Sequence, residues 1–561
     1  MAAIDPISGA LGKKAAAHLL RRLTFGPTKA MVDEFATKNI DQAIAQLFAP
    51  VVSPTETDAE LSWLVAKPLA NQKIDEFDKI ASFKAWWLNR MIKSGSNANE
   101  KLTFFLHSHF TCIFSVFEKH TAVYFQNKLL RKYALGNIKT LARAISLDNA
   151  MLMLLSGSSN VKGSPNENYA RELLELYTIG KYYPAPETLG TNDYGNYTED
   201  DIKAAARVLS GFDTDLTYNT IDPITAIPRG KVKLTPAGLS SQHDVNPKIF
   251  SARFGNRQIA PRTKVGSSTT EADVLDEVDQ LINMIFEQPE TARNICRKIY
   301  RFFVYYNTPN RLKNPANPDE GYLLNDYVET NIITPLAATL TANNFELKPV
   351  LEQLFKSQHF FFQDSPATNT EDRTDGAIIK SPLDLSVGIM RLFNINYTNV
   401  EGLRFVAKSL DKQGLDLYEP LDVAGYEAYH AFPFYHRAWI SANYLAERYL
   451  FPKTLMLGKD GMTDLGYRLD VVDFVKNSGA FTGDIGDTVA FVTQTVELLL
   501  PEPITTERKN FFKDKLLDKQ PDLEWTAEWS DFITTKDDKI VREMLEIFFW
   551  HLLKSPEYQL M

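Results

Sequence analysis

The stretch SPNENYARELLELYTIG, residues 164–180, carries a complete set of helix signals. Ser164 is a good N-cap, and Pro165 suits the first helical position. Glu167 stands where a capping-box carboxylate reaches back to the cap. Gly180 can adopt the left-handed conformation that ends many helices. The sequence therefore predicts one helix over residues 164–180.

The charged side chains of this predicted helix gather on one face. Glu167, Arg171 and Glu175 follow one another at intervals of four residues, a spacing at which opposite charges pair on a helix. Glu172 lies on the face away from this ladder. The helix also has an apolar stripe that would face a core, formed by four large side chains: Tyr169, Leu173, Leu176 and Tyr177.

The composition is typical of a globular protein. Of the 561 residues 44% are hydrophobic and 12% aromatic, which is enough for a sizeable core, and the length fits three or four domains or one large domain with insertions. The net charge of −9 gives no footprint for nucleic acid or anionic lipid, so we expect neither as a partner. Two cysteines, Cys112 and Cys296, exclude a disulfide framework. Both lie in apolar runs, so buried free thiols are favoured over a single bridge.

Helical spacing of apolar residues recurs through most of the chain. Thr198 and Asp201 form the two halves of a capping box for a helix that ends near Gly211. Residues 100–117 fit a buried helix, although periodicity alone leaves a strand open. Further helices are predicted over residues 15–25, 28–48, 75–92, 271–286, 291–306, 326–342, 346–355, 383–393 and 400–410. The one over 326–342 contains Pro335, so we expect it to be kinked or in two pieces.

The helical pattern is lost between residues 212 and 265. Short β-like pieces such as KVKL lie among Pro and Gly there, and loops are also predicted at 181–196 and 363–376. The sequence therefore predicts a mainly α fold. We expect a single large multi-helix globular domain over residues 1–561, with a short β-hairpin or loop excursion at about 212–265.

Three histidines are candidate metal ligands. His107 and His109 are two residues apart, so they would share a face of a strand but point to nearly opposite sides of a helix. One core histidine and one histidine at an interface or surface is the simpler interpretation. His243, followed by Asp244 and Lys248, lies in the long irregular stretch, where loops are often functional. A His–Asp pair can orient a general base or bind a metal, but more often it stabilises a loop.

Several stretches, in this order, carry a family resemblance. They are HLLRRLTFGPT (18–28), FFLHSHF (104–110), DNAML with PNENYARELLELYTIG (148–180), YTEDDIKAAARVLSGF (197–212), HDVNPK (243–248), LYEPLDVAGY (417–426) and WISANYLAER (439–448). Together they resemble the bacterial family called domain of unknown function 1800 (DUF 1800). The chain departs from the family pattern where Tyr177, Phe212 and Tyr426 stand, since the family often has His at the first position and Trp at the other two.

The resemblance implies a partner rather than a reaction. Members of this family are frequently encoded beside an exported protein of the alkaline phosphatase and sulfatase type, which suggests an exported or cell-envelope pair. The N-terminus, MAAIDPISGA, shows no signal peptide, and no window is apolar enough to span a bilayer. We therefore expect a protein that leaves the cytoplasm with a partner or after processing, to the periplasm, cell surface or medium, or that stays cytoplasmic.

Two functions fit these observations. The first is a helical binding or assembly protein that acts with the exported partner. The alternative is a metal-dependent hydrolase, in which a divalent cation would be held by histidine and carboxylate groups. No HExxH, CxxC, GxSxG or P-loop spacing supports the hydrolase. Its centre would gather His107 or His109 with Glu167, Arg171, Glu172, His243 and Asp244, with Glu172 pointing toward His109 and His243.

Overall fold

The computed structural model confirms the mainly α fold. It describes residues 3–181, 190, 192–306, 324–362, 377–397, 399–432, 434–459 and 464–561. The loop expected at 363–376 and most of the loop at 181–196 lie outside these residues. No described helix is long and apolar enough to cross a membrane. The division into domains stays a prediction.

The first ten helices lead up to and into the stretch at residues 164–180. Their starts follow local signals: Asp75, for example, accepts a hydrogen bond from the Asp78 amide as the N-cap of α4. The helices are α1 (Gly12–Leu23), α2 (Lys29–Ala36), α3 (Ile40–Leu47), α4 (Glu76–Ile92), α5 (Asn99–His109), α6 (Phe114–Phe117), α7 (His120–Lys132), α8 (Ile138–Ile145), α9 (Asn149–Leu154) and α10 (Asn168–Glu172).

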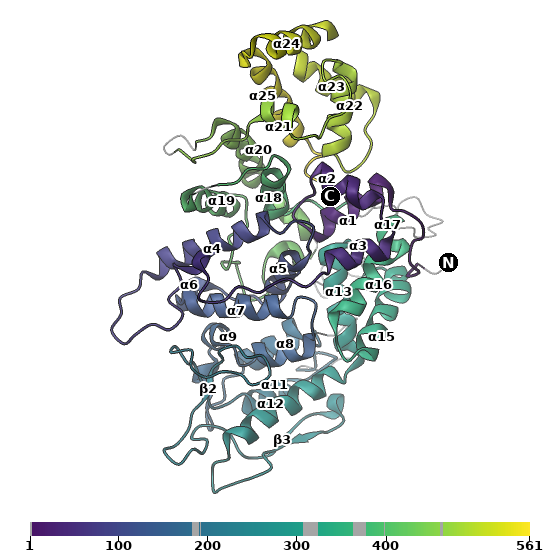
Figure 1. Cartoon of the computed structure of the whole chain (residues 1–561). Coiled ribbons are helices and arrows are strands. Elements are labelled where there is room, and N and C mark those ends of the chain that lie inside the picture. Colours follow the sequence, from purple (N-terminus) through teal and green to yellow (C-terminus); the bar gives the residue numbers. More distant parts are fainter. Residues whose placement is uncertain are drawn as a thin grey trace.

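The expected β excursion follows α11 (Glu199–Val208), whose capping box of Thr198 and Asp201 is present. It holds two small antiparallel pairs, β1 (Phe212–Asp213) with β2 (Lys231–Val232), and β3 (Lys248–Ile249) with β4 (Gln258–Ile259). The excursion forms the lower end of the molecule in Figure 1, and α12 (Glu271–Phe286) lies beside it. The chain then continues through α13 (Pro289–Phe303).

The next helices lie on the right of Figure 1, and the last ones form its upper part. Helix α14 (Asp326–Val328) passes through a π-helical segment, Glu329–Ile333, into α15 (Thr334–Ala342), so the predicted helix over 326–342 is in pieces around Pro335. The others are α16 (Leu347–Lys356), α17 (Gln358–Phe362), α18 (Pro382–Leu392), α19 (Val400–Lys412), α20 (Ala442–Leu457), α21 (Val471–Asn477), α22 (Thr488–Leu499), α23 (Thr506–Leu517), α24 (Asp522–Thr535) and α25 (Lys539–Leu553).

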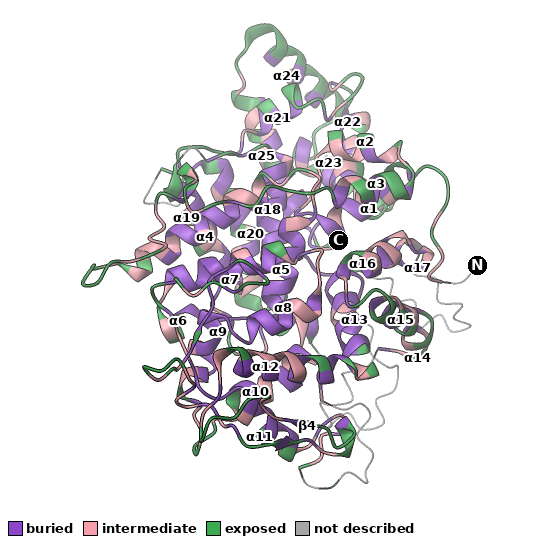
Figure 2. Cartoon of the chain, turned by 60° about the horizontal axis from the view of Figure 1, so that its bottom comes forward, coloured by how far each residue is buried: buried purple, intermediate pink, exposed green. Residues whose placement is uncertain are grey.

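Helix α5 lies at the centre of the core. Every residue from Glu100 to His109 is buried, and Figure 2 shows buried residues concentrated around α5, α7 and α8. Buried apolar side chains from Leu11 to Met561 form one continuous cluster. Both cysteines are free and buried, so Cys112 and Cys296 form no bridge. A helix rather than a strand at 99–109 means that His107 and His109 point to different surroundings.

The helix predicted over 164–180 is shorter than expected. Helix α10 begins at Asn168, so the prediction of Ser164 as N-cap is wrong. The buried Asn160 side chain accepts a hydrogen bond from the Asn166 amide at 3.1 Å, and Asn166 in turn accepts one from the Asn168 amide at 3.0 Å. These contacts hold the SPN segment outside the helix, which begins about one turn later than predicted.

The second half of this stretch is a π-helical segment, Leu173–Tyr177. The Thr178 hydroxyl donates to the Leu173 carbonyl at 2.5 Å, and the Gly180 amide donates to the Leu174 carbonyl at 2.8 Å. Gly180 has φ +78°, so its predicted left-handed conformation is confirmed. A wider turn of this kind is often found at functional sites.

Candidate functional site

A cavity of about 390 Å³ opens beside the end of the π-helical segment. It lies between that segment, α5, α13 and the irregular chain around residues 424–435. We call it the α5–α13 cavity. Its volume falls in the range of small-molecule sites. Its walls are largely aromatic: the Phe302 ring lies 4.7 Å from the Tyr429 ring and 5.2 Å from the Phe105 ring, measured between centroids.

Three polar side chains on the wall of this cavity bind successive backbone carbonyls. Lys298 Nζ donates to the Leu176 carbonyl at 2.6 Å, His109 Nε2 lies 3.1 Å from the Tyr177 carbonyl, and Asn294 Nδ2 donates to the Thr178 carbonyl at 2.8 Å. Carbonyls at a helix end lack intrahelical partners. Two elements far apart in the sequence, α5 and α13, therefore satisfy the end of the π-helical segment. Because a carbonyl only accepts, His109 must carry its proton on Nε2.

The basic groups of α13 give the cavity its charge. Asn294, Lys298 and Arg301 are spaced by four and three residues, so they share one face of the helix. The Arg301 guanidinium lies over the Tyr435 ring, 5.6 Å from its centroid. Glu175 is the acidic residue that lines the cavity, and it forms an ion pair with Lys181. Lys298 and Arg301 therefore place two basic side chains on the cavity wall.

Lys298 is the most perturbed of these groups. Burial lowers its pKa to about 7, and the neighbouring Arg301 lowers it further in the same direction. In the part of the chain that the structure describes, Lys298 forms no ion pair with a carboxylate. Its amine therefore has a large neutral fraction at neutral pH, which is uncommon for lysine.

The two histidines on the wall are neutral. Burial lowers the pKa of His109 well below its ordinary value, and Lys298 adds to this effect. Burial also lowers the pKa of His430, against the opposing effect of Asp422, whose Oδ1 lies 3.9 Å from His430 Nε2. The same Nε2 lies 3.3 Å from the Gly425 carbonyl, which requires a proton on that nitrogen.

Glu172 does not line the cavity, but its pKa is affected by Glu175, which does. Its side chain is half-buried, and burial together with Glu175 raises its pKa to about 7. Asp422 contributes in the same direction. Glu172 thus forms an acidic group with Glu175 and Asp422. His243, toward which it was expected to point, instead contacts Ser210 and Glu277.

The predicted charge ladder forms only in part. Arg171 lies 3.4 Å from Glu167, but its main partner is Glu199 on α11, at 2.6 Å and 3.1 Å from its two terminal nitrogens. Tyr194 also donates to Glu199, at 2.9 Å. Glu175 pairs with Lys181 instead of Arg171. Arg171 therefore ties α10 to the start of α11, at a partly exposed place.

His107 lies in the aromatic core. Its ring centroid is 4.0 Å from that of Tyr418, and its Nε2 lies 3.2 Å from the Tyr426 hydroxyl. That hydroxyl donates its own proton to the Asp416 carbonyl at 2.9 Å, so His107 donates to the Tyr426 oxygen. Burial lowers the pKa of His107 to about 3. The contacts are those of a neutral core histidine.

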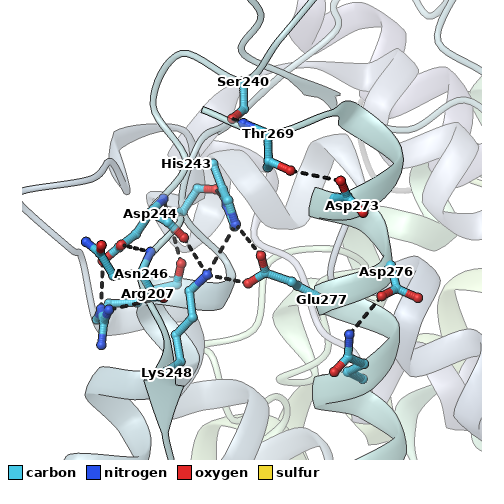
Figure 3. Close-up of polar contacts among 12 residues, drawn as sticks. Arg207, Ser240, His243, Asp244, Asn246, Lys248, Thr269, Asp273, Asp276 and Glu277 are labelled. Carbon is cyan, nitrogen blue, oxygen red and sulfur yellow. Dashed lines mark hydrogen bonds and ion pairs between the residues drawn. The ribbon is translucent and has the colours of Figure 1, made fainter. Parts of the chain in front are cut away.

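His243 belongs to a buried polar cluster between the excursion and α12, shown in Figure 3. Its Nδ1 donates to the Ser210 carbonyl at 2.8 Å, and its Nε2 lies 3.2 Å from Glu277 Oε1 and 3.4 Å from Lys248 Nζ. Lys248 and Glu277 form an ion pair. The side chains of Lys248, Glu277 and His243 are all fully buried. We call these three residues the Lys248 cluster.

Asp244 extends this arrangement to α11. Its carboxylate pairs with Arg207 at 2.7 Å, and its amide donates to the Ser210 hydroxyl oxygen at 3.0 Å. Its carbonyl accepts a hydrogen bond from Lys248 Nζ. The HDVNPK motif thus holds the excursion against α11 and α12. This is the loop-stabilising role that the sequence left open for His243 and Asp244.

The structure does not bring the proposed hydrolase residues together. His107, His109 and His243 have separate partners, and Glu167 and Arg171 lie with Glu199. Among the residues that the structure describes, no three His, Cys, Asp or Glu side chains are grouped so that they could hold a metal ion. The metal-dependent hydrolase therefore stays a prediction.

The sequence analysis missed the residues that line the α5–α13 cavity on α13. Their signal is a polar and basic face, Asn294, Lys298 and Arg301, on a helix that also carries Arg293 and Arg297. Such a face is common on exposed helices, so only its burial against the π-helical segment distinguishes it. His109 was the one predicted candidate that the structure places on the cavity wall.

A family model with the description "Protein of unknown function (DUF1800)" matches residues 18–560, which is nearly the whole chain. The resemblance drawn from the separate motifs is therefore confirmed. The comparison with curated proteins and the comparison with solved structures gave no match. The description states no activity, so a function has to be argued from the site.

Proposed function

The chain belongs to the DUF1800 family, and from the geometry of its α5–α13 cavity we propose that it binds a small anionic ligand there. One observation carries the proposal: Lys298 and Arg301 lie on one face of α13 and line a cavity whose acidic residue, Glu175, is already paired with Lys181. The sequence favoured binding to an exported protein partner, whereas a small-molecule ligand is proposed here from the cavity.

The walls define the chemistry of that ligand. A guanidinium recognises the two oxygens of a carboxylate or phosphate in a planar, bidentate manner. The rings of Phe105, Phe302 and Tyr429 would stack against an aromatic or other flat apolar group. A small aromatic carboxylate or phosphate ester combines both features.

Calorimetric titration with phenyl phosphate tests the proposal. Benzyl alcohol serves as the neutral probe, and Arg301→Gln removes the charge from the cavity. The control is Arg293→Gln, because Arg293 is an exposed residue of the same helix. We expect Arg301→Gln to weaken phenyl phosphate binding by about tenfold to a hundredfold, the range for a charge-assisted hydrogen bond, and Arg293→Gln to leave it unchanged. Equal binding of the neutral probe, or equal effects of the two substitutions, would refute the proposal.

An exported partner of the alkaline phosphatase or sulfatase type remains part of this proposal, since the family resemblance suggests it. The supporting argument is the gene neighbourhood of the family, which is an association. Co-expression of the chain with the neighbouring exported protein, followed by size-exclusion chromatography, tests it. Elution of the two proteins in one peak is the expected result, and separate elution at micromolar concentration would contradict it.

A further inference from the structure

Lys298 is positioned as a nucleophile on the wall of the α5–α13 cavity. Its Nζ donates to the Leu176 carbonyl oxygen at 2.6 Å, and this hydrogen bond uses an N–H of the amine rather than its lone pair. The hydrogen bond therefore fixes the amine and leaves its lone pair directed elsewhere. The cavity of about 390 Å³ provides room for a ligand beside it.

We propose that Lys298 forms an imine with an anionic carbonyl compound, a 2-oxo acid with an aromatic side chain, while Arg301 binds the ligand carboxylate. The inference rests on the proposed anion-binding function, which it deepens by naming the class of ligand and a covalent step. The spacing of Lys298 and Arg301, one helical turn apart on the same face of α13, matches a ligand whose carbonyl adjoins its carboxylate.

The step is balanced without any further reactant. The Lys298 lone pair attacks the carbonyl carbon, a C–N bond forms, and the carbonyl oxygen leaves as water with the two amine hydrogens. Protonation of the imine nitrogen restores one N–H, which can again donate to the Leu176 carbonyl. The positive iminium then lies at the C-terminal end of a helical segment, where the backbone dipole favours a cation.

The charges around Lys298 favour a neutral amine. Burial lowers the pKa of Lys298, and the positive charge of Arg301 on the same helix acts in the same direction, which gives the pKa of about 7. The other titratable groups on the wall are His109 from α5, Glu175 from the π-helical segment, and Tyr429, His430 and Tyr435 from the chain around residues 424–435. The two histidines are neutral, and Glu175 is held by Lys181. At pH 7 about half of the Lys298 amine is unprotonated, against fewer than about one in a thousand for a lysine in water.

A purely structural role predicts a different outcome. If Lys298 only satisfies the Leu176 carbonyl, it has no reason to react faster than other lysines. Lys348 offers the comparison, because its side chain is 52% exposed on α16. Accessibility alone would favour Lys348, whereas the proposal favours Lys298.

Reductive trapping distinguishes the two. The full chain is incubated with phenylpyruvate and sodium borohydride between pH 6 and 9, and the added mass is located by peptide mass spectrometry. We expect at least roughly tenfold more label on Lys298 than on Lys348 at pH 7, because the neutral fractions differ so strongly. Label on Lys298 should level off near pH 8, while label on Lys348 keeps rising. Equal labelling of the two lysines, or no label on Lys298, would overturn the proposal.

Two further measurements keep the test clear. Lys298→Arg keeps a donor for the Leu176 carbonyl but cannot form an imine, so it should remain folded and lose the label at this position. Acetophenone, a ketone without a carboxylate, should label Lys298 at least tenfold less than phenylpyruvate. Binding of phenyl phosphate without trapping of phenylpyruvate would refute the imine alone, whereas the absence of both would refute the anion site as well.

Discussion

Replacing Asp148 by asparagine should stabilise the protein at alkaline pH. Asp148 is the N-cap of α9 and accepts a hydrogen bond from the Met151 amide at 3.0 Å. The residue is only 3% exposed, and burial raises its pKa from 3.8 to about 7, against the opposing effect of the Met151 and Ala150 amides. Asparagine keeps an oxygen for the cap and never ionises.

The sign follows from proton binding. Between pH 4 and pH 7 the unfolded chain has lost the Asp148 proton while the folded chain keeps it, so the free energy of unfolding falls as pH rises through this window. At about 1.36 kcal/mol for each pH unit, the whole interval amounts to about 4 kcal/mol, of which about 3 kcal/mol falls between pH 5 and pH 8. Asp148→Asn removes this loss.

Urea denaturation followed by circular dichroism at pH 5 and pH 8 measures the effect. The gain of Asp148→Asn over the wild type should be larger at pH 8 than at pH 5 by up to about 3 kcal/mol. Asp487→Asn is the matched control, because Asp487 also caps a helix but is exposed. A gain that does not change with pH, or an equal gain in the control, would refute the argument from burial.

Three further substitutions have defined outcomes in the same denaturation assay. Lys248→Met should cost about 3–5 kcal/mol by leaving Glu277 buried without its cation, and adding Glu277→Leu should recover more than half; a double variant no more stable than the single one would contradict this. Gly180→Ala should cost about 1–3 kcal/mol, since φ is +78° and the new Cβ would lie 2.9 Å from Asn294 Nδ2, and an unchanged midpoint would be the contrary result. Arg171→Ala should cost no more than about 1 kcal/mol, because its ion pairs are partly exposed, and a larger loss would show that it does more than tie two helices.

Local sequence signals predicted the secondary structure correctly where a few neighbouring residues determine the backbone conformation. The predicted helix over 271–286 has the observed bounds of α12, and the capping box of Thr198 and Asp201 is present as expected. The loss of periodicity after residue 212 marked the β excursion correctly. Periodicity and caps act within one or two turns, so they can be recognised in the sequence alone.

The same signals failed where distant residues compete with them. Ser164 has the features of an N-cap, but the Asn160 side chain binds the Asn166 amide, and α10 begins only at Asn168. The ladder of Glu167, Arg171 and Glu175 depends on which other charges approach it. In the folded chain Glu199 pairs with Arg171, and Lys181 pairs with Glu175, so the predicted pair of Arg171 with Glu175 does not form.

The sequence by itself determined the mainly α class, the family, the place of the excursion and the list of polar side chains. Only the tertiary structure decided which of them share a site. Lys298 meets the Leu176 carbonyl across 122 residues, and His109 meets the Tyr177 carbonyl across 68. His243 meets Glu277 in the same way, across 34 residues, and has no partner in common with His109. Burial and charge depend on such long-range contacts, and these two quantities turn an ordinary lysine into a candidate nucleophile.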